Sequence, residues 1–269
     1  MMVTKEKSIG VFDSGVGGLT VVRELNRLLP SENIIYFGDT ARVPYGSHSP
    51  ETIIRFAKQD LRFLLQNNIK AVLIACGTVS STAINVLRTM TDIPIVGVIE
   101  AASKKAVEVS KHGKIAVLAT QATVSSHAYK KKIEILDKEA EVIEKGCPLF
   151  VPLIENGYIE ETNQITNLIV DEYLKEVLSY GPDTIILGCT HYPIIKSIIH
   201  NHIPNAVIVE AGKEAAIELS SILGKHGSNN ISIGIRRYIV SEKTENFSRI
   251  CEMFLGEQIT EEIEVIEMD

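Results

Sequence analysis

Cysteine is scarce in this 269-residue chain, and its spacing excludes two common uses of the residue. The four cysteines, at positions 76, 147, 189 and 251, form no Cys-x-x-Cys pair and have no histidine at zinc-finger spacing, so we expect no bound metal. Scaffolds held together by disulfides are usually much smaller secreted domains. The thiols are therefore expected to be reduced, as in a cytoplasmic protein.

Long apolar runs and an excess of positive charge are also missing. Apolar runs such as Ala71–Cys76 are far shorter than a membrane span, and the N-terminal apolar stretch is too short for a signal peptide. Lys and Arg number 27 against 34 Asp and Glu, which gives a formal net charge of −7. A nucleic-acid-binding protein usually carries the opposite balance. We expect a soluble, cytoplasmic protein with neither nucleic acid nor a membrane as its partner.

The chain does contain short apolar runs that alternate with amphipathic stretches. The runs are rich in Val and Ile and mostly lack polar alternation, which is typical of strands buried on both faces of a parallel sheet. Strands are predicted at Ser8–Phe12, Asn33–Phe37, Ala71–Ala75, Ile95–Val98, Lys114–Ala119, Glu141–Glu144, Thr184–Leu187, Ala206–Val209 and Ile231–Val240. The stretches between them predict helices, including one that Pro30 stops, one capped by Ser49 and one over Glu160–Tyr180. This order predicts an α/β fold with mostly parallel sheets.

Two segments of the sequence recur in the same order. Residues 7–20 resemble residues 113–126, and residues 69–81 resemble residues 182–193. Chance similarity between hydrophobic strands is the alternative explanation. We predict two related halves, with residues 1–99 and 208–269 forming a first, discontinuous domain and residues 100–207 a second.

Polar and reactive residues follow the predicted strands at their carboxyl ends, where ligands bind in open parallel sheets. They are Asp13-Ser14, Pro44-Tyr45-Gly46, Cys76-Gly77-Thr78 and Cys189-Thr190-His191. Cys76 and Cys189 occupy matching points of the repeat, each before a predicted helix start, where the helix dipole favours a thiolate. Two thiols facing each other across a cleft could remove a proton from one face of a carbon and deliver one to the other. The alternative is that each cysteine is a small buried hydrophobe, as we expect for Cys147 and Cys251.

Three further residues are candidates for proton chemistry beside the thiols. Asp13 could hold a proton near a thiol or an ammonium group, or simply cap a turn. His191 could be the proton partner of Cys189. Glu155 could point into the cleft or start a helix.

No cofactor is indicated by the sequence. The glycine-rich stretch 15–18 looks like a phosphate-binding loop but lacks the spacing of known nucleotide motifs. No lysine stands where pyridoxal phosphate would need one.

Together these residues closely resemble the glutamate racemases. The resemblance rests on FDSGVGGLTV from Phe12, GDTARVPYG from Gly38, the Ala75-Cys76 strand end, CPLFVPLIE from Cys147 and GCTHYP from Gly188. It implies two similar α/β domains related by a pseudo-twofold axis, with the active site in the cleft between them. It also implies a homodimer and a cofactor-independent interconversion of L- and D-glutamate that supplies D-glutamate for peptidoglycan.

The resemblance also assigns roles to residues. Cys76 and Cys189 correspond to the catalytic thiols, with Cys189 acting on L-glutamate and Cys76 on D-glutamate. Asp13, His191 and Glu155 correspond to assisting groups. The positions that hold the substrate correspond to Asp13, Ser14, Pro44, Tyr45, Gly46, Gly77, Thr78, Thr190 and His191.

One departure from the family pattern leaves alternatives open. The family usually has Asn after the first catalytic cysteine, and Gly77 stands here, so a substrate contact is lost unless a backbone N–H or a water replaces it. One alternative function is a racemase for aspartate or another acidic amino acid, although that branch typically has Glu at the position of His191. A non-catalytic amino-acid-binding protein and a nucleotide-binding protein are more distant alternatives.

Overall fold

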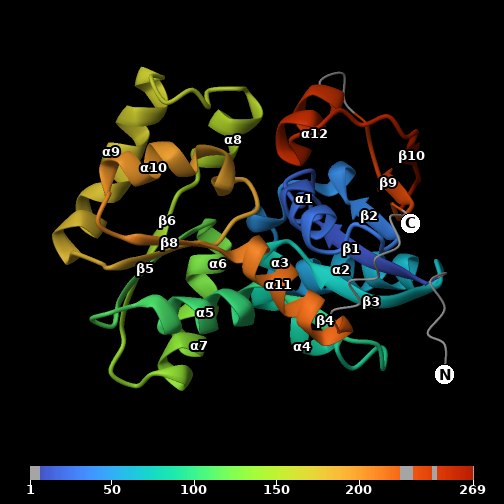
Figure 1. The fold of residues 1–269 in the computed structure, drawn as a ribbon, viewed down its shortest axis with the longest axis horizontal. Coiled ribbons are helices and arrows are strands. Elements are labelled where there is room, and N and C mark those ends of the chain that lie inside the picture. The colour runs from blue at the N-terminus through green and yellow to red at the C-terminus, as the bar shows by residue number, and fades with distance from the viewer. Residues whose placement is uncertain (1–6, 225–232, 244–246, 269) are drawn as a thin grey trace.

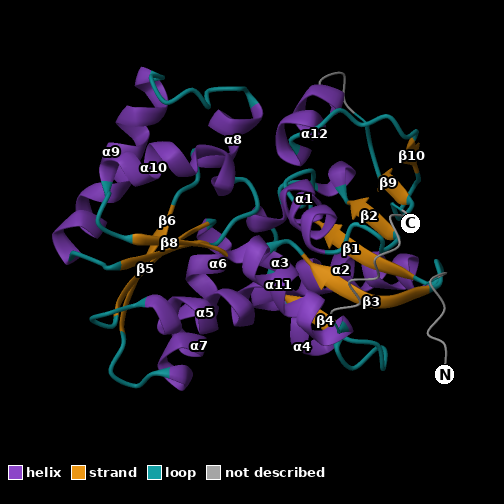
Figure 2. Ribbon diagram, in the orientation of Figure 1, coloured by secondary structure: helices purple, strands orange, loops and turns teal. Residues whose placement is uncertain are grey.

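The computed structural model describes residues 7–224, 233–243 and 247–268, which form two parallel sheets flanked by helices (Figures 1 and 2). The first sheet has the order β10-β9-β2-β1-β3-β4 and the second the order β6-β5-β7-β8. Every strand pairing among the described residues is parallel. The first sheet comprises β1 (Ser8–Asp13), β2 (Ile34–Gly38), β3 (Ile69–Ile74), β4 (Ile95–Gly97), β9 (Arg236–Val240) and β10 (Ile263–Val265), and the second β5 (Lys114–Ala119), β6 (Glu141–Gly146), β7 (Thr184–Leu187) and β8 (Val207–Glu210).

Helices connect successive strands and cover the sheets. They are α1 (Leu19–Leu28), α2 (Pro50–Leu65), α3 (Gly77–Thr82), α4 (Ile84–Leu87), α5 (Val98–Val109), α6 (Gln121–Ser126), α7 (Ala128–Leu136), α8 (Phe150–Glu155), α9 (Gln164–Tyr180), α10 (Lys196–His202), α11 (Ala211–Leu223) and α12 (Phe247–Leu255). The cap predicted at Ser49 is confirmed, because its side chain accepts a hydrogen bond from the Thr52 N–H at the start of α2. The helix predicted over Glu160–Tyr180 begins at Gln164 and ends at Gly181, whose φ is +66°. Only a residue that tolerates left-handed backbone closes a helix in this way at no steric cost.

The α/β fold with parallel sheets is confirmed, and the strand order repeats between the two sheets. The order β2-β1-β3-β4 corresponds to β6-β5-β7-β8, so β1 matches β5 and β3 matches β7. We call the part of the chain built on the first sheet the first half and the part built on the second sheet the second half. Figure 1 shows the halves side by side, with α3, α6 and α11 near their junction. The two cysteines of the repeat thus follow equivalent strands.

The strands differ from the predictions mainly at the C-terminal end. The predicted strand Ile231–Val240 begins only at Arg236, and residues 231 and 232 lie outside the described residues. β10 was not predicted, because it is a three-residue edge strand with no apolar run. β8 pairs with β7, so the boundary predicted at residue 207 falls within a strand of the second sheet. The division into two domains remains a prediction.

A buried polar cluster fixes the loop that follows β2. The carboxylates of Asp39 and Asp60 are fully buried, and Arg42 donates to both of them, over 2.6 Å from Nε to Asp39 Oδ2 and 3.0 Å from Nη2 to Asp60 Oδ1. The Tyr45 hydroxyl lies between the same carboxylates, 2.9 Å from Asp60 Oδ2. A hydroxyl carries one proton and donates to one of the two acids at a time. Burial first, and then the charge of Asp39, raise the pKa of Asp60 well above its usual value, and the charge of Arg42 opposes them.

Replacement of Arg42 by Met is expected to lower the free energy of unfolding by about 3–5 kcal/mol, because it leaves buried carboxylates without their cation. The matched control is Arg55→Met: Arg55 also lies over the Phe56 ring but is exposed, and its loss is expected to cost about 1 kcal/mol or less. Urea unfolding of both variants measures the difference. Equal losses of unfolding free energy in the two variants would show that the ion pairs of Arg42 with Asp39 and Asp60 add nothing to stability.

Candidate active site

The carboxyl ends of β3 and β7 place Cys76 and Cys189 at the junction of the two halves. Cys76 is the N-cap of α3, with extended backbone, and Cys189 follows Gly188 directly after β7. The halves are joined around them by hydrogen bonds. The Thr20 hydroxyl donates to the carbonyl of Thr190 over 3.0 Å, and the hydroxyl oxygens of Thr78 and Thr120 lie 3.1 Å apart. Cys76 and Cys189 therefore come from opposite halves and lie close enough for the charge of one to act on the other. Their action as a catalytic pair remains a prediction.

Cys76 lies in a buried pocket with Ser14 and Asp13. The Ser14 hydroxyl oxygen is 3.3 Å from the Cys76 sulfur. Burial first, and then the nearby Asp13 carboxyl, raise the pKa of Cys76 to about 12, although the bond from Ser14 opposes them. The cysteine therefore holds its proton at neutral pH, as an acid waiting for a carbanion must.

Asp13 combines the two roles considered for it. Its Oδ2 accepts from the N–H groups of Gly15 and Gly18, at 3.3 and 3.0 Å, so the carboxyl does cap the turn before α1. Its Oδ1 is buried and has no hydrogen-bond partner among the described residues. Burial raises the pKa of Asp13 above its usual value. A buried carboxyl oxygen without a hydrogen-bond partner is suited to bind an incoming ammonium group or a proton.

The glycine-rich turn is not a phosphate-binding loop. The amides of Gly15 and Gly18 already bind Asp13, an anion of the chain itself. Gly17 serves close packing instead: a Cβ there would lie 2.2 Å from the Thr190 hydroxyl and 2.4 Å from His191 Nδ1. The turn therefore brings the first half against the second rather than cradling a nucleotide.

Cys189, His191 and Glu155 form a chain of polar contacts in the second half. The Cys189 sulfur is 3.9 Å from His191 Nδ1, and His191 Nε2 is 2.9 Å from Glu155 Oε1. Burial lowers the pKa of His191, but its bonds to Cys189 and Glu155 outweigh this effect and raise the pKa to about 10. The ring is therefore charged at neutral pH, and a positive charge beside a sulfur stabilises negative charge on it. Glu155 is the last residue of α8, so the alternative that it starts a helix is wrong.

The C-terminal helix α12 supports this chain of contacts, which the sequence analysis did not foresee. The Phe254 ring meets the His191 ring edge-on, with centroids 4.8 Å apart. Arg249 donates to the main-chain oxygen of Glu155 over 3.1 Å. No local pattern reveals these contacts, because they join residues more than 60 positions apart.

The residues predicted to hold the substrate are only partly available for it. Ser14, Thr78, Gly77 and Thr190 surround the two cysteines. The Tyr45 hydroxyl points instead into the buried cluster with Asp39 and Asp60, where both acids already engage it. For Pro44, Tyr45 and Gly46 only a role of the backbone remains predicted.

Thr120 was missed, although the repeat contained the signal for it. Thr120 aligns with Ser14 when residues 113–126 are matched to residues 7–20. Its hydroxyl caps α6 and contacts Thr78 across the junction. It therefore belongs to the same cluster of hydroxyl groups as Ser14 and Thr78.

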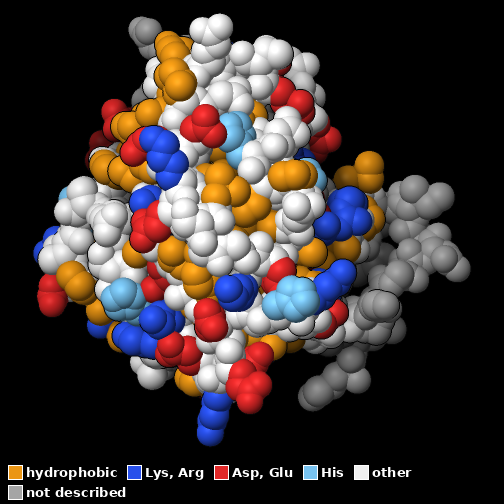
Figure 3. Space-filling view, turned by 90° about the vertical axis from the view of Figure 1, so that its left-hand side faces the viewer, with side chains coloured by type: hydrophobic (Ala, Val, Ile, Leu, Met, Phe, Trp, Pro, Cys, Tyr) orange, Lys and Arg blue, Asp and Glu red, His pale blue; other side chains and the backbone are white. Residues whose placement is uncertain are grey.

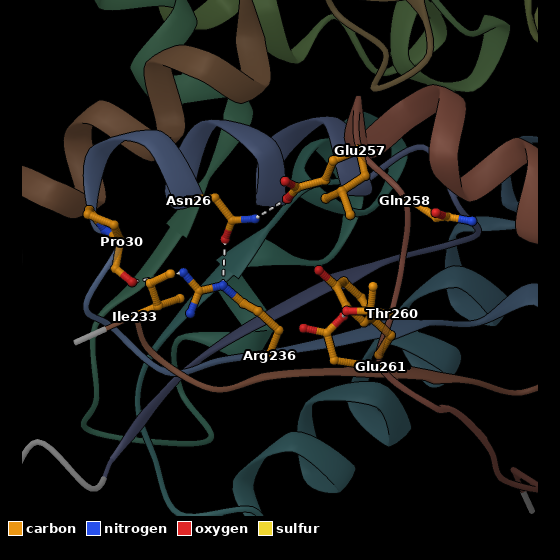
Figure 4. A pocket seen from close by; sticks show the side chains of 10 residues that line it. Asn26, Pro30, Ile233, Arg236, Glu257, Gln258, Thr260 and Glu261 are labelled. Atoms are coloured by element: carbon orange, nitrogen blue, oxygen red, sulfur yellow. Dashed lines mark hydrogen bonds between the residues drawn. The ribbon is translucent and has the colours of Figure 1, made fainter. Parts of the chain in front are cut away.

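Other features of the described residues lie apart from this site. No group of three or more His, Cys, Asp or Glu side chains in the described ranges could hold a metal ion, and no helix there is long and apolar enough to cross a membrane. A cavity of about 310 Å³ lies between α1, β9 and the segment after α12 (Figure 4). Arg236 extends into it and donates to Asn26 over 2.6 Å. None of the predicted site residues lines this cavity.

Comparison with known proteins agrees with this geometry. The family model for Asp/Glu/hydantoin racemases matches residues 9–219. The chain belongs to that family. The glutamate racemase of Persephonella marina is 44% identical over 94% of this chain and 95% of its own length, and that of Sulfurihydrogenibium sp. is 41% identical over 97% and 98%. The crystal structure of the Francisella tularensis glutamate racemase in complex with D-glutamate superposes with a TM-score of 0.91, at 36% identity and with 99% of each chain covered. The resemblance read from the motifs is thereby confirmed.

The pKa of His191 gives a test of the Cys189 side of the site. Because folding raises this pKa from 6.5 to about 10, the charged ring stabilises the folded protein below about pH 6.5, and this contribution is lost as the pH rises through about 10. Glu155→Gln removes one of the two bonds that raise the pKa, so His191 is expected to titrate at lower pH, as followed by NMR. Glu144→Gln removes the partner of His127 and is the matched control, with no effect on His191. An unchanged titration in Glu155→Gln would contradict the contact.

Proposed function

We propose that this member of the family is a glutamate racemase that interconverts L- and D-glutamate without a cofactor and so supplies D-glutamate for peptidoglycan synthesis. The observation that carries the proposal is the pair of cysteines at equivalent strand ends of the two halves, each with its own polar partners. The glutamate racemases to which the chain is similar align with it over nearly their whole length, and this supports glutamate as the substrate.

The reaction needs one base and one acid on opposite faces of the α-carbon. One thiolate takes the α-proton, and the opposed thiol gives its own proton to the other face, so the carbon keeps one hydrogen and changes configuration. The enzyme ends with its thiol and thiolate exchanged. The reverse reaction restores the first state, which is why each cysteine must serve as both acid and base.

The surroundings of the two cysteines support an assignment of the two substrates. Cys76 keeps its proton because it is buried beside Asp13, whereas Cys189 lies next to the charged ring of His191. The protonated Cys76 is ready to act as the acid, and the charged His191 ring can stabilise negative charge on the Cys189 sulfur when that sulfur acts as the base. This division of roles suits L-glutamate if Cys189 faces the α-proton of that isomer, as the family resemblance implies.

The polar groups around the cysteines suit the charges of glutamate. The free Oδ1 of Asp13 is placed to accept from the α-ammonium group. The hydroxyls of Ser14, Thr78 and Thr190 and nearby backbone N–H groups are donors suited to the carboxylates. Stabilising negative charge on the α-carboxylate lowers the barrier to removing the adjacent proton.

We also propose a cytoplasmic homodimer. Reduced thiols are required for the reaction, which favours a reducing compartment. The second half exposes large apolar side chains, among them Ile165 and Leu168 of α9. Figure 3 faces the side of the molecule that lies on the left in Figure 1, where this half is, and shows apolar side chains between charged groups there. Exposed apolar surface of this kind is what a subunit interface covers.

Single serine substitutions test the two-thiol mechanism. Cys76→Ser and Cys189→Ser are each expected to lower kcat for racemisation by about 10²–10⁴-fold, because each removes one of two acid–base groups. Cys76→Ser is expected to retain more α-proton exchange of L-glutamate, and Cys189→Ser more exchange of D-glutamate. Cys251→Ala, a change at a fully buried cysteine in the core, is the control and is expected to racemise normally. Full racemisation by both serine variants would refute the mechanism, and faster turnover of aspartate than of glutamate would refute the substrate.

Light scattering of the purified protein tests the dimer. The expected mass is twice the 29.6 kDa of one chain. Leu168→Glu places a charge on the apolar face of α9 and is expected to shift the mass toward that of the monomer. A wild-type protein of monomer mass would contradict the proposal.

A further inference from the structure

Tyr36 contacts both of the glycines whose amides bind Asp13. It lies in β2, in register with Val11 of β1, and is fully buried. Its hydroxyl donates to the carbonyl of Gly15 over 2.6 Å. Its ring lies against Gly18, where a Cβ atom would stand 3.0 Å from Tyr36 Cε2. One side chain therefore supports both residues that donate to Asp13 Oδ2.

The carbonyl of Gly15 has little room to turn away from this bond. A Cβ atom on Gly38, the last residue of β2, would stand 2.4 Å from the Gly15 oxygen. The oxygen therefore lies close to both the Tyr36 hydroxyl and the Gly38 backbone. Because the carbonyl and the N–H of Gly15 belong to one residue, fixing the carbonyl also restricts the direction of the N–H that binds Asp13.

Packing alone does not require a hydroxyl at position 36. The ring belongs to the same buried cluster as Val11, and phenylalanine fills such a position without burying a polar group. A buried tyrosine hydroxyl needs a hydrogen-bond partner, and the Gly15 carbonyl is such a partner. Burial first, and then the charge of Asp13, raise the pKa of Tyr36 well above its ordinary value. The hydroxyl therefore keeps its proton and remains a donor.

The orientation of the Asp13 carboxyl depends on the turn that Tyr36 supports. The amides of Gly15 and Gly18 both donate to Oδ2, at 3.3 and 3.0 Å, and neither donates to Oδ1. Oδ1 is the oxygen to which we assign the ammonium group of the substrate. A turn released from Tyr36 would let the carboxyl rotate, and the ammonium group would then lack an acceptor in a fixed position.

We propose that Tyr36 is a positioning residue that holds the Asp13 carboxyl with Oδ1 available to the ammonium group of glutamate. The proposal rests on the proposed racemase function and adds a residue to its machinery. Tyr36 acts through the turn of Gly15 and Gly18 and does not itself touch the substrate. Loss of its hydroxyl therefore matters only while residue 13 is a carboxylate.

A double-mutant cycle of Tyr36→Phe and Asp13→Asn tests this dependence. Tyr36→Phe keeps the ring and removes the hydroxyl alone. It is expected to lower kcat/KM for racemisation of L-glutamate about 10-fold, less than the about 100-fold that a misplacement of about 1 Å can cost. The amide of Asp13→Asn has an oxygen for the glycine N–H groups but no second oxygen for the ammonium group. Adding Tyr36→Phe to Asp13→Asn is therefore expected to change kcat/KM less than about two-fold.

Two results of the cycle would overturn the proposal. One is the same loss of kcat/KM from Tyr36→Phe in both backgrounds, which would mean that the hydroxyl acts on the fold and not through Asp13. The other is no loss in the wild-type background.

Tyr192→Phe is the matched control. The Tyr192 hydroxyl is also buried and donates to a main-chain carbonyl, that of Cys147, over 3.0 Å in the second half. Its bond involves no residue of the turn that binds Asp13. The effect of Tyr192→Phe on kcat/KM is therefore expected to be equal, within about two-fold, with and without Asp13→Asn. A dependence on Asp13 as large as that of Tyr36→Phe would contradict a specific role of Tyr36.

Binding replaces turnover if Asp13→Asn is too slow to assay. The Kd of D-glutamate, measured by calorimetry, is expected to rise about 10-fold with Tyr36→Phe in the wild-type background and less than about two-fold in the Asp13→Asn background. Equal losses of affinity would overturn the proposal. A wild type that neither racemises nor binds glutamate would refute the proposed function instead.

Discussion

The contact between the carboxyl ends of β3 and β7 is the constraint on which the site depends. Each strand is buried in its own parallel sheet, and the chemistry-bearing residue follows it where the sheet ends. Neither half alone brings an acid and a base to opposite faces of one carbon. A Cβ on Gly77 would stand 2.3 Å from the main-chain oxygen of Gly188, so the backbones of the two halves approach each other directly at this junction. Packing at the junction therefore brings the two cysteines to one site.

The two halves share a strand order but not the environment of their cysteines. Cys76 is buried beside the Asp13 carboxyl, and both effects favour its neutral form, while the Ser14 hydroxyl opposes them. Cys189 instead has an imidazolium connected to the half-exposed Glu155. Symmetry of the fold therefore supplies two thiols at equivalent strand ends, and local side chains give them different electrostatic surroundings. Because the enzyme must run in both directions, the difference between the two surroundings has to be small enough for each cysteine to act both as acid and as base.

Much of the fold and part of the site could be predicted from the sequence. Strands such as β1, β3, β5 and β7 were predictable because burial on both faces leaves continuous apolar runs. The repeat singled out Cys76 and Cys189 and also contained Thr120. What failed depended on long-range contacts. The partner of the Tyr45 hydroxyl, Asp60, comes from α2, and Phe254 reaches His191 from a C-terminal helix. The partner of the glycine-rich stretch 15–18 could not be read from its composition, because two of its amides bind the side chain of Asp13 at the end of β1.

The central claim is that two thiols on opposite faces invert the α-carbon of glutamate with solvent-derived protons. The most direct measurement is chiral and mass analysis of the product formed by the wild-type protein from L-glutamate in heavy water, with reduced thiols and no added cofactor. The account predicts D-glutamate that carries deuterium at the α-carbon from the first turnovers. The absence of D-glutamate, or D-glutamate that retains the original proton, would contradict it.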